Sequence, residues 1–153
     1  MTGTQNHECL AGVKAAIDYL ADLVPTVSSA DRRSKLRAAM MAIQSYERTL
    51  ADRLLDGLAE RPPFKVWGIK EKANRANRVP TVSITLPDRP AGAIAEHLAA
   101  REIYVWSGNM YALELTERLG LENKGGLLRI GLVHYNTPEE VDRLLTALDE
   151  LRG

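Results

Sequence analysis

The residue best suited to chemistry in this sequence is Arg129, which interrupts an otherwise apolar run over residues 127–133. A guanidinium presents a planar fork that can hold a carboxylate with two parallel hydrogen bonds. The simpler alternative is an arginine at a strand end that pairs with a nearby aspartate or glutamate. The residue types alone leave both interpretations open, and Arg129 is therefore a candidate carboxylate-binding residue.

A second candidate lies at the start of the chain, where Gly3 and Thr4 precede a helical pattern over residues 5–24. A hydroxyl and free backbone N–H groups at the N-terminus of a helix suit a phosphate, because the helix dipole and the unpaired donors act together. The alternative is that Thr4 is a plain N-cap for that helix. Local sequence does not decide between these interpretations.

The residues after Arg129 have the signature of a strand that turns sharply into a helix. Thr137 suits the N-cap, Pro138 suits the first helical position, and Glu140 completes a capping box with Thr137. Apolar residues then recur at helical spacing, namely Val141, Leu144, Leu145, Leu148 and Leu151. We therefore expect a buried strand followed by a terminal amphipathic helix.

Two segments carry a resemblance to a known family. The sequence RIGLVHYNTPEEVDRLLTAL, which starts at Arg129, resembles the end of the class V aminotransferases, a family of fold-type I enzymes that use pyridoxal phosphate (PLP) and include the cysteine desulfurases. The segment TGTQNHE at residues 2–8, followed by Gly12, resembles the family's TGT-x-N-H-E…G segment. Because the two matches lie at opposite ends, the resemblance covers nearly the whole chain.

The resemblance implies a role for each candidate residue. Arg129 takes the place of the arginine that binds the α-carboxylate of an amino-acid substrate, and Asn109 lies on the loop at 106–112 that corresponds to the active-site loop. Gly3 and Thr4 take the place of the segment that reaches the cofactor phosphate of the neighbouring subunit, which implies a homodimer or larger oligomer. The cofactor of the full-length family is PLP.

This sequence departs from the cysteine desulfurases at the loop where they carry a nucleophilic cysteine. Asn109, Met110 and Tyr111 stand there instead, and persulfide formation needs a thiolate. The chain's one cysteine, Cys9, is on the first helix and is expected to be a small core or surface residue without catalytic duty. The sequence is therefore more similar to relatives that lack the cysteine.

PLP chemistry also needs a lysine that forms a Schiff base and an acidic partner for the pyridine nitrogen. In the family both precede the TGT segment, and no lysine here has the family's S-x-H-K context. We expect a C-terminal substrate-binding domain that is inactive alone and binds no PLP, either a piece of a larger enzyme or a truncated reading frame. The alternative is a free-standing, non-enzymatic remnant that self-associates or binds a protein partner.

Composition excludes several other classes. The chain has 153 residues, 45% hydrophobic and 26% charged, which is typical of one globular domain. Twenty basic and twenty acidic residues cancel, no apolar run is long enough to span a membrane, and a single cysteine favours a reducing, cytoplasmic compartment. The three histidines lack metal-ligand spacing, with His97 expected at the surface and His134 bracing the turn that follows it. The one basic cluster (Lys65, Lys70, Lys72, Arg75 and Arg78) is expected to be solvated surface rather than a nucleic-acid site.

The remaining pattern predicts the elements that position these residues. Helices are expected over residues 5–24, 31–60, 91–100 and 111–119, with Ser28 or Ser29 capping the second, and strands over 64–69, 80–86, 103–106 and 127–133. Residues 70–78 read as a loop. The order indicates an α+β (α/β) fold, a small mixed sheet of about four strands with helices on one face, preceded by two N-terminal helices. Residues 1–30 are expected to form a helix from the junction with a missing large domain, and residues 31–153 the small C-terminal domain.

Overall fold

The chain folds into two compact units, residues 1–46 and 47–153. The structure, a computed structural model, describes residues 3–25 and 31–152. The division lies inside α2 (Arg32–Ala59), whereas the sequence suggested a boundary after residue 30. That residues 1–30 come from a junction with a large domain stays a prediction.

The first unit consists of α1 (His7–Asp22) and the first half of α2. The N-cap of α1 is Asn6, whose side chain accepts a hydrogen bond from the Cys9 N–H at 2.9 Å. The alternative that Thr4 caps this helix is therefore wrong, because an asparagine closer to the first turn satisfies its free donors.

The start of α2 is capped by Asp31, which is closer to the helix than the serines that the sequence suggested. Asp31 accepts hydrogen bonds from both the backbone N–H and the hydroxyl of Ser34, at 2.9 and 3.0 Å. These bonds hold the pKa of Asp31 below its ordinary value, the backbone bond being the largest cause. The predicted caps Ser28 and Ser29 lie outside the described residues.

The second unit is built on a four-stranded sheet in the order β1-β2-β4-β3. The strands are β1 (Lys65–Trp67), β2 (Thr81–Thr85), β3 (Trp106–Gly108) and β4 (Leu127–Gly131). The α+β class and the four strands are confirmed, but each neighbouring pair is antiparallel, so the sheet is not mixed. β2 and β3 run in the same direction, but β4 lies between them. The two strands that the helical connection joins are therefore not neighbours and do not form a parallel pair.

Helices and short turns connect these strands. The helices are α3 (Ala91–Ala99), α4 (Leu113–Arg118) and α5 (Pro138–Asp149), and the 3₁₀ turns are Lys72–Asn77, Glu122–Lys124 and Glu150–Arg152. The strand predicted over residues 103–106 is shifted, because only from Trp106 onward does the backbone pair with β4. None of the described helices is long and apolar enough to cross a bilayer.

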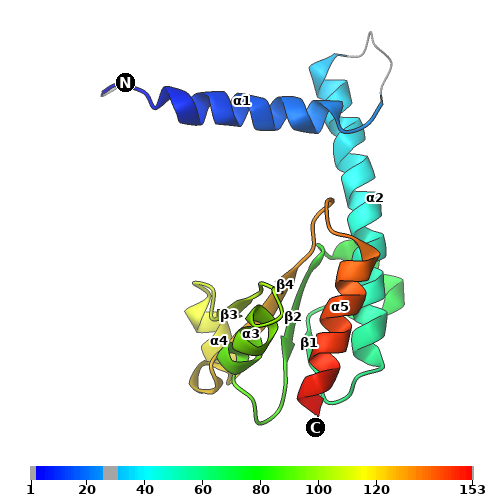
Figure 1. The fold of residues 1–153 in the computed structure, drawn as a ribbon, viewed down its shortest axis with the longest axis vertical. Coiled ribbons are helices and arrows are strands. Elements are labelled where there is room, and N and C mark those ends of the chain that lie inside the picture. Colours follow the sequence, from blue (N-terminus) through cyan, green and yellow to red (C-terminus); the bar gives the residue numbers. More distant parts are fainter. Residues whose placement is uncertain (1–2, 26–30, 153) are drawn as a thin grey trace. The chain divides into compact units, whose positions relative to one another are not determined.

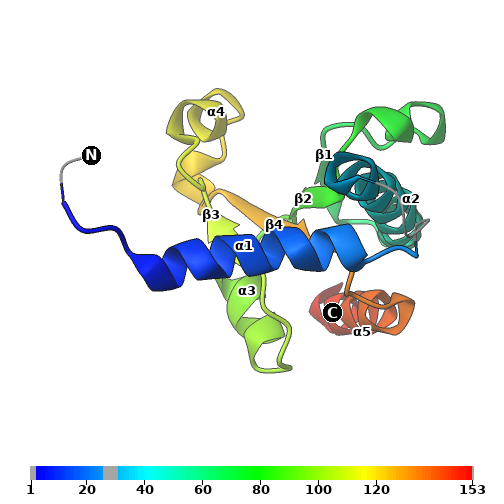
Figure 2. The same ribbon diagram turned by 90° about the horizontal axis from the view of Figure 1, so that it is seen from above.

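One face of the sheet is covered by the core. Val82 and Ile84 of β2 alternate inward, as do Leu128 and Ile130 of β4, and each is at most 3% exposed. They pack with buried side chains of the second half of α2, of α3 and of α5, including Leu54, Leu58, Ile94, Leu98, Leu144 and Leu148. Figure 1 shows α5 beside the second half of α2, next to the sheet. Figure 2 shows α3 and α5 on one side of the sheet and α4 on the other.

The terminal helix is fixed by the capping box that the sequence predicts. The Thr137 hydroxyl accepts from the Glu140 N–H at 3.3 Å, and the Glu140 carboxylate accepts from the Thr137 N–H at 2.9 Å. Asn136 braces the same turn, since its side chain accepts from the Val133 N–H and donates to Glu140. The pKa of Glu140 is lowered, chiefly by the bond from Asn136. These bonds therefore fix the turn that joins β4, which carries Arg129, to α5.

Candidate functional site

The sheet face opposite the core carries a row of polar and aromatic residues. Trp67, Ser83, Arg129 and Trp106 are successive Cα partners across β1, β2, β4 and β3. Directly paired residues of an antiparallel sheet point to the same face. Since Val82, Ile84 and Leu128 are buried in the core, their neighbours in sequence must lie on this opposite face.

Arg129 is in the middle of β4 and is exposed. Its guanidinium carbon lies 5.6 Å from the centroid of the Trp106 ring, within the range of a cation–π interaction. Among the described residues Arg129 has no ion pair with any carboxylate, so the alternative of a purely structural local pair finds no support. A guanidinium held against an indole with its donors open can bind an external carboxylate.

The loop after β3 holds an unusual backbone. Met110 and Tyr111 both have positive φ, 54° and 64°, a conformation that costs a bulky residue roughly 1–2 kcal/mol. Tyr111 is 97% exposed. Such strain persists only where the surroundings over-determine the backbone.

A hydrogen-bond network supplies that constraint. The Asn109 side chain accepts from the Tyr111 N–H at 3.2 Å and donates to the Glu122 carboxylate at 3.2 Å, and Glu122 also accepts from the buried hydroxyl of Thr116. Both ends of the Asn109 amide are therefore engaged within the fold, the oxygen in the loop itself and the nitrogen with Glu122 beyond α4. Contact between Asn109 and a substrate stays a prediction, and its observed contacts are those of a residue that positions Tyr111.

A shallow cavity of ≈ 360 Å³ borders this loop. Its lining includes Trp106, Asn109, Tyr111 and Glu122. Trp106 is thus shared between the cavity and the Arg129 guanidinium. Sequence reasoning did not single out Trp106 or Glu122, because the first looked like one aromatic in a strand and the second like a polar turn residue.

The predicted phosphate-binding residues belong to the first unit. Gly3 has a φ of +130° with open space around it, and Thr4 is exposed in the extended segment before Asn6. Neither residue touches the N-terminus of α1 as a cap. Phosphate binding by Gly3 and Thr4 stays a prediction.

The basic cluster over residues 65–78 is largely used within the fold. Arg75 is 8% exposed and forms ion pairs with Asp52 and Asp56 at 3.2 and 2.9 Å. Lys72 also pairs with Asp56, and the Arg78 guanidinium donates to three backbone carbonyls, of Ile69, Val79 and Thr81. The expectation of a solvated basic surface is wrong for Arg75 and Arg78, which acidic side chains and backbone carbonyls engage, whereas Lys72 is exposed despite its ion pair.

The remaining candidates have structural contacts or lie at the surface. His97 is half-buried rather than exposed as expected, because its Nε2 lies 3.0 Å from the Ala147 carbonyl, between α3 and α5. The ring of His134 meets Tyr135 edge-on at 5.4 Å. Cys9 is an exposed free thiol on α1. The described part of the chain contains no group of three potential metal ligands.

Comparison with known proteins gives one consistent result. The family model for Aminotransferase class-V matches residues 1–144. An uncharacterized protein of Mycobacterium tuberculosis is 31% identical over 97% of this chain and 35% of its own length, and the aminotransferase-like protein FGM3 of Gibberella zeae is 36% identical over 71% of the chain and 27% of its own. This chain therefore spans about a third of the length of the curated relatives that it matches.

Solved structures agree with the sequence comparisons. The cysteine desulfurase CsdA from Escherichia coli superposes with a TM-score of 0.71 at 27% identity, over 97% of this chain and 31% of that one. The cysteine desulfurase from Thermococcus onnurineus gives a TM-score of 0.68 at 28% identity, over 78% of this chain and 28% of that one. The expected fold is therefore confirmed.

Proposed function

Because the chain belongs to the class V aminotransferase family, which is PLP-dependent, we propose that it is the C-terminal substrate-binding domain of a cysteine desulfurase-like PLP enzyme. The substrate is an amino acid or a related carboxylate. The observation that carries this proposal is Arg129, an exposed guanidinium on the open sheet face, within cation–π range of Trp106 and free of carboxylate partners among the described residues.

In this proposal Arg129 binds the substrate carboxylate. Trp106 restrains the guanidinium, so that the arginine side chain loses less conformational entropy on binding. The loop that follows holds Tyr111 at the cavity that Trp106 also lines, through the Asn109–Glu122–Thr116 network. No thiol stands on the loop, so persulfide transfer is not part of its chemistry. The domain's task is to bind and orient the substrate.

The residues of this chain do not by themselves fit a PLP site. A Schiff-base lysine is usually desolvated in an enclosed pocket. Lys65 is exposed against the Trp67 ring, at 3.7 Å, and Lys72 is paired with Asp56. The lysine and the cofactor's acidic partner would come from a large domain, with Gly3 and Thr4 contributing to the phosphate of a partner subunit, and the domain alone would be inactive.

Carboxylate binding can be followed through Trp106, since the sequence holds only two tryptophans. In a Trp67→Phe background we would titrate L-alanine and record Trp106 emission, with L-alaninamide as the control that keeps the ammonium group and lacks the carboxylate. The proposal predicts a saturable change with L-alanine alone. Arg129→Gln abolishes it, and Arg129→Lys weakens it because an ammonium lacks the planar fork. A titration that is unchanged in Arg129→Gln would contradict the proposal.

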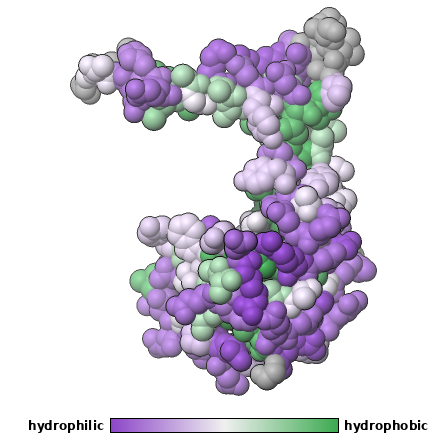
Figure 3. All heavy atoms as spheres, in the orientation of Figure 1, coloured by the Kyte–Doolittle hydropathy of each residue, from purple (hydrophilic) through white to green (hydrophobic). Residues whose placement is uncertain are grey.

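One observation favours the alternative of a free-standing protein that self-associates. Leu10 and Val13 on α1 are 55% and 59% exposed, and Figure 3 shows pale and green residues along this helix. An exposed apolar stripe is commonly covered by another protein surface. Sedimentation at several concentrations tests it, because Leu10→Glu should shift an oligomer toward monomer, and a parent chain that is monomeric throughout would remove this alternative.

A further inference from the structure

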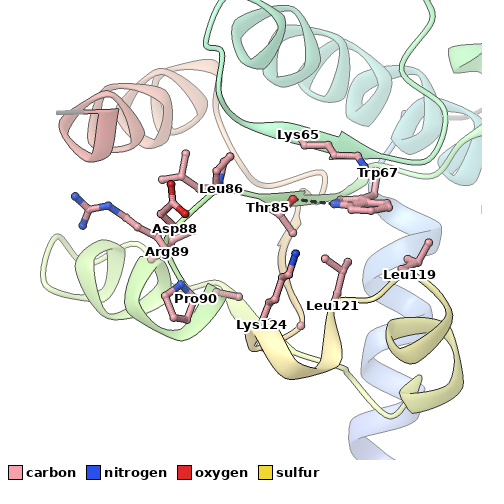
Figure 4. Close-up of a pocket in the computed structure, with 14 residues that line it drawn as sticks. Lys65, Trp67, Thr85, Leu86, Asp88, Arg89, Pro90, Leu119, Leu121 and Lys124 are labelled. Carbon is pink, nitrogen blue, oxygen red and sulfur yellow. Dashed lines mark hydrogen bonds between the residues drawn. The ribbon is translucent and has the colours of Figure 1, made fainter.

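A second cavity, of ≈ 590 Å³, lies in the unit formed by residues 47–153, and the loop at 109–111 does not contribute to its lining. Residues from several elements surround it: β1, the end of β2, the turn into α3, and the segment from α4 to β4. Figure 4 shows the space between Trp67 and Thr85 on one side and Leu121 and Lys124 on the other. Its size is that of cavities which hold small molecules.

Two ammonium groups border the cavity. In Figure 4 the Lys124 side chain extends toward Thr85, and the Lys65 side chain runs to the indole of Trp67, 3.7 Å from its centroid. Neither lysine forms an ion pair within the described part of the chain. Arg89 directs its guanidinium away, and the one acidic lining residue, Asp88, lies at the end opposite Trp67. Among the residues that line the cavity, the charges near Trp67 are therefore those of the two lysines.

The same space has a fixed apolar wall. The Trp67 indole N–H donates to the Thr85 hydroxyl at 3.0 Å, which sets the ring plane. Leu86, Ile94 and Leu121 line the cavity and are each at most 7% exposed. Pro90 and Ala91 also line it, so the positive end of the α3 dipole lies at the wall. Rigid aromatic and aliphatic surface beside open cations suits a ligand with an apolar body and a negative end.

We propose that this cavity binds a small organic anion whose aromatic or aliphatic body packs on Trp67 and Leu121 and whose anionic group lies at Lys124, with the Lys65 ammonium on the indole adding to the attraction. The proposal does not rest on the carboxylate role of Arg129. Arg129 is absent from the lining of this cavity, and Trp67 and Trp106 report on the two places separately.

The test uses the whole chain with Trp106→Phe, so that Trp67 is the only tryptophan. The probe is 3-phenylpropionate, and 3-phenylpropionamide is its uncharged isostere. We expect saturable quenching of Trp67 by the carboxylate. The amide should bind several-fold more weakly, because it keeps the body and loses the charge.

Substitutions assign the charge to the two lysines. Lys124→Gln should raise the Kd about three- to fivefold, the effect of one partly exposed ion pair, and the double variant with Lys65→Gln about tenfold or more. Lys70→Gln is the matched control, because Lys70 is an exposed lysine of the same unit outside the cavity lining. It should leave the Kd unchanged.

Each other outcome overturns the proposal. Equal affinity for acid and amide would exclude an anion site. Equal effects of Lys124→Gln and Lys70→Gln would indicate general charge attraction, and quenching that never saturates would indicate no site. Arg129→Gln in the same background should leave Trp67 quenching intact, because Arg129 does not line this cavity. Absence of a saturable Trp106 change when L-alanine is added to the Trp67→Phe protein refutes the carboxylate role. Absence of saturable Trp67 quenching in the Trp106→Phe protein refutes this cavity, so the two proposals fail separately.

Discussion

The pairing of β3 with β4 depends on Gly126, and replacing this residue with alanine should damage the candidate site from a distance. A Cβ added at Gly126 would lie 2.4 Å from the carbonyl carbon and oxygen of Gly108, the last residue of β3. Ordinary contacts between carbon atoms are about 3.5–4.0 Å, so roughly 1 Å of movement is required. Both partners are backbone, and no flexible side chain can give way.

The cost can be worked out against a second glycine. Gly120 has a similar φ, +68° against +76°, but open space where its Cβ would be. Alanine at a left-handed position costs about 1–2 kcal/mol, offset by about 0.4–1 kcal/mol from the less flexible unfolded chain, so Gly120→Ala should cost about 1 kcal/mol. Gly126→Ala adds the displacement of β3, and two lost backbone hydrogen bonds at about 1 kcal/mol each bring the total to about 3 kcal/mol or more.

Urea unfolding followed by circular dichroism gives the two free energies on one scale. In a Trp67→Phe background the emission of Trp106 without urea should also change in Gly126→Ala and not in Gly120→Ala, because β3 carries Trp106 to Arg129. If Gly126→Ala costs no more than Gly120→Ala and leaves Trp106 emission unchanged, the described packing of β3 on β4 is wrong.

Three further predictions concern the frame that holds the site, all measured by chemical denaturation. Thr137→Ala should lower the free energy of unfolding by about 1 kcal/mol because α5 loses its N-cap, whereas Thr146→Ala on the exposed side of the same helix should stay within about 0.5 kcal/mol. Leu148→Ala should cost about 2–5 kcal/mol because Leu148 is fully buried, and Leu115→Ala, at a side chain 53% exposed, should be near neutral; similar values for the two would place the core elsewhere. Hydrogen bonds from Arg152 and Arg61 hold the pKa of Asp149 below its ordinary value of 3.8. The stability that this carboxylate contributes to the fold is therefore present above pH 3.8 and is lost as the pH falls through the folded-state pKa. Between about pH 5 and about pH 3 the parent should lose more stability than Asp149→Asn, and equal losses would refute that role.

Local patterns predicted the elements of this chain well where one physical signal dominated. The capping box at Thr137 and Glu140 is confirmed in both directions, since its chemistry lies within four residues. Alternation of apolar residues predicted β2 and the burial of Val82 and Ile84. The two motifs that resemble the family also led to the correct fold.

What the sequence did not predict depends on pairing between distant segments. The strand expected from residue 103 begins at Trp106, because the start of β3 is set by its register against Arg129 on β4. Antiparallel neighbours throughout the sheet follow from the insertion of β4 between β2 and β3, which no local pattern encodes.

The same limit applies to the candidate site. Arg129 was predicted from its residue type and its motif, but the row that joins it to Trp106, Ser83 and Trp67 exists only once the strands are aligned. The contact between Asn109 and Glu122 spans a helix, and a basic cluster that looked solvated contains Arg75, buried against acidic residues of α2. Charge along the sequence says little about which ions meet in space.

The central claim is that this chain is the substrate-binding domain of a larger PLP enzyme. The most direct test is the intact mass of the native polypeptide that carries this sequence, isolated from the cells that make it and treated with borohydride to fix any lysine-bound cofactor. We predict a polypeptide about three times this length, since the chain spans 31–35% of relatives that it matches almost throughout, with one cofactor fixed to a lysine outside residues 1–153. A product of about 153 residues that carries no fixed cofactor would contradict the claim and favour the free-standing alternative.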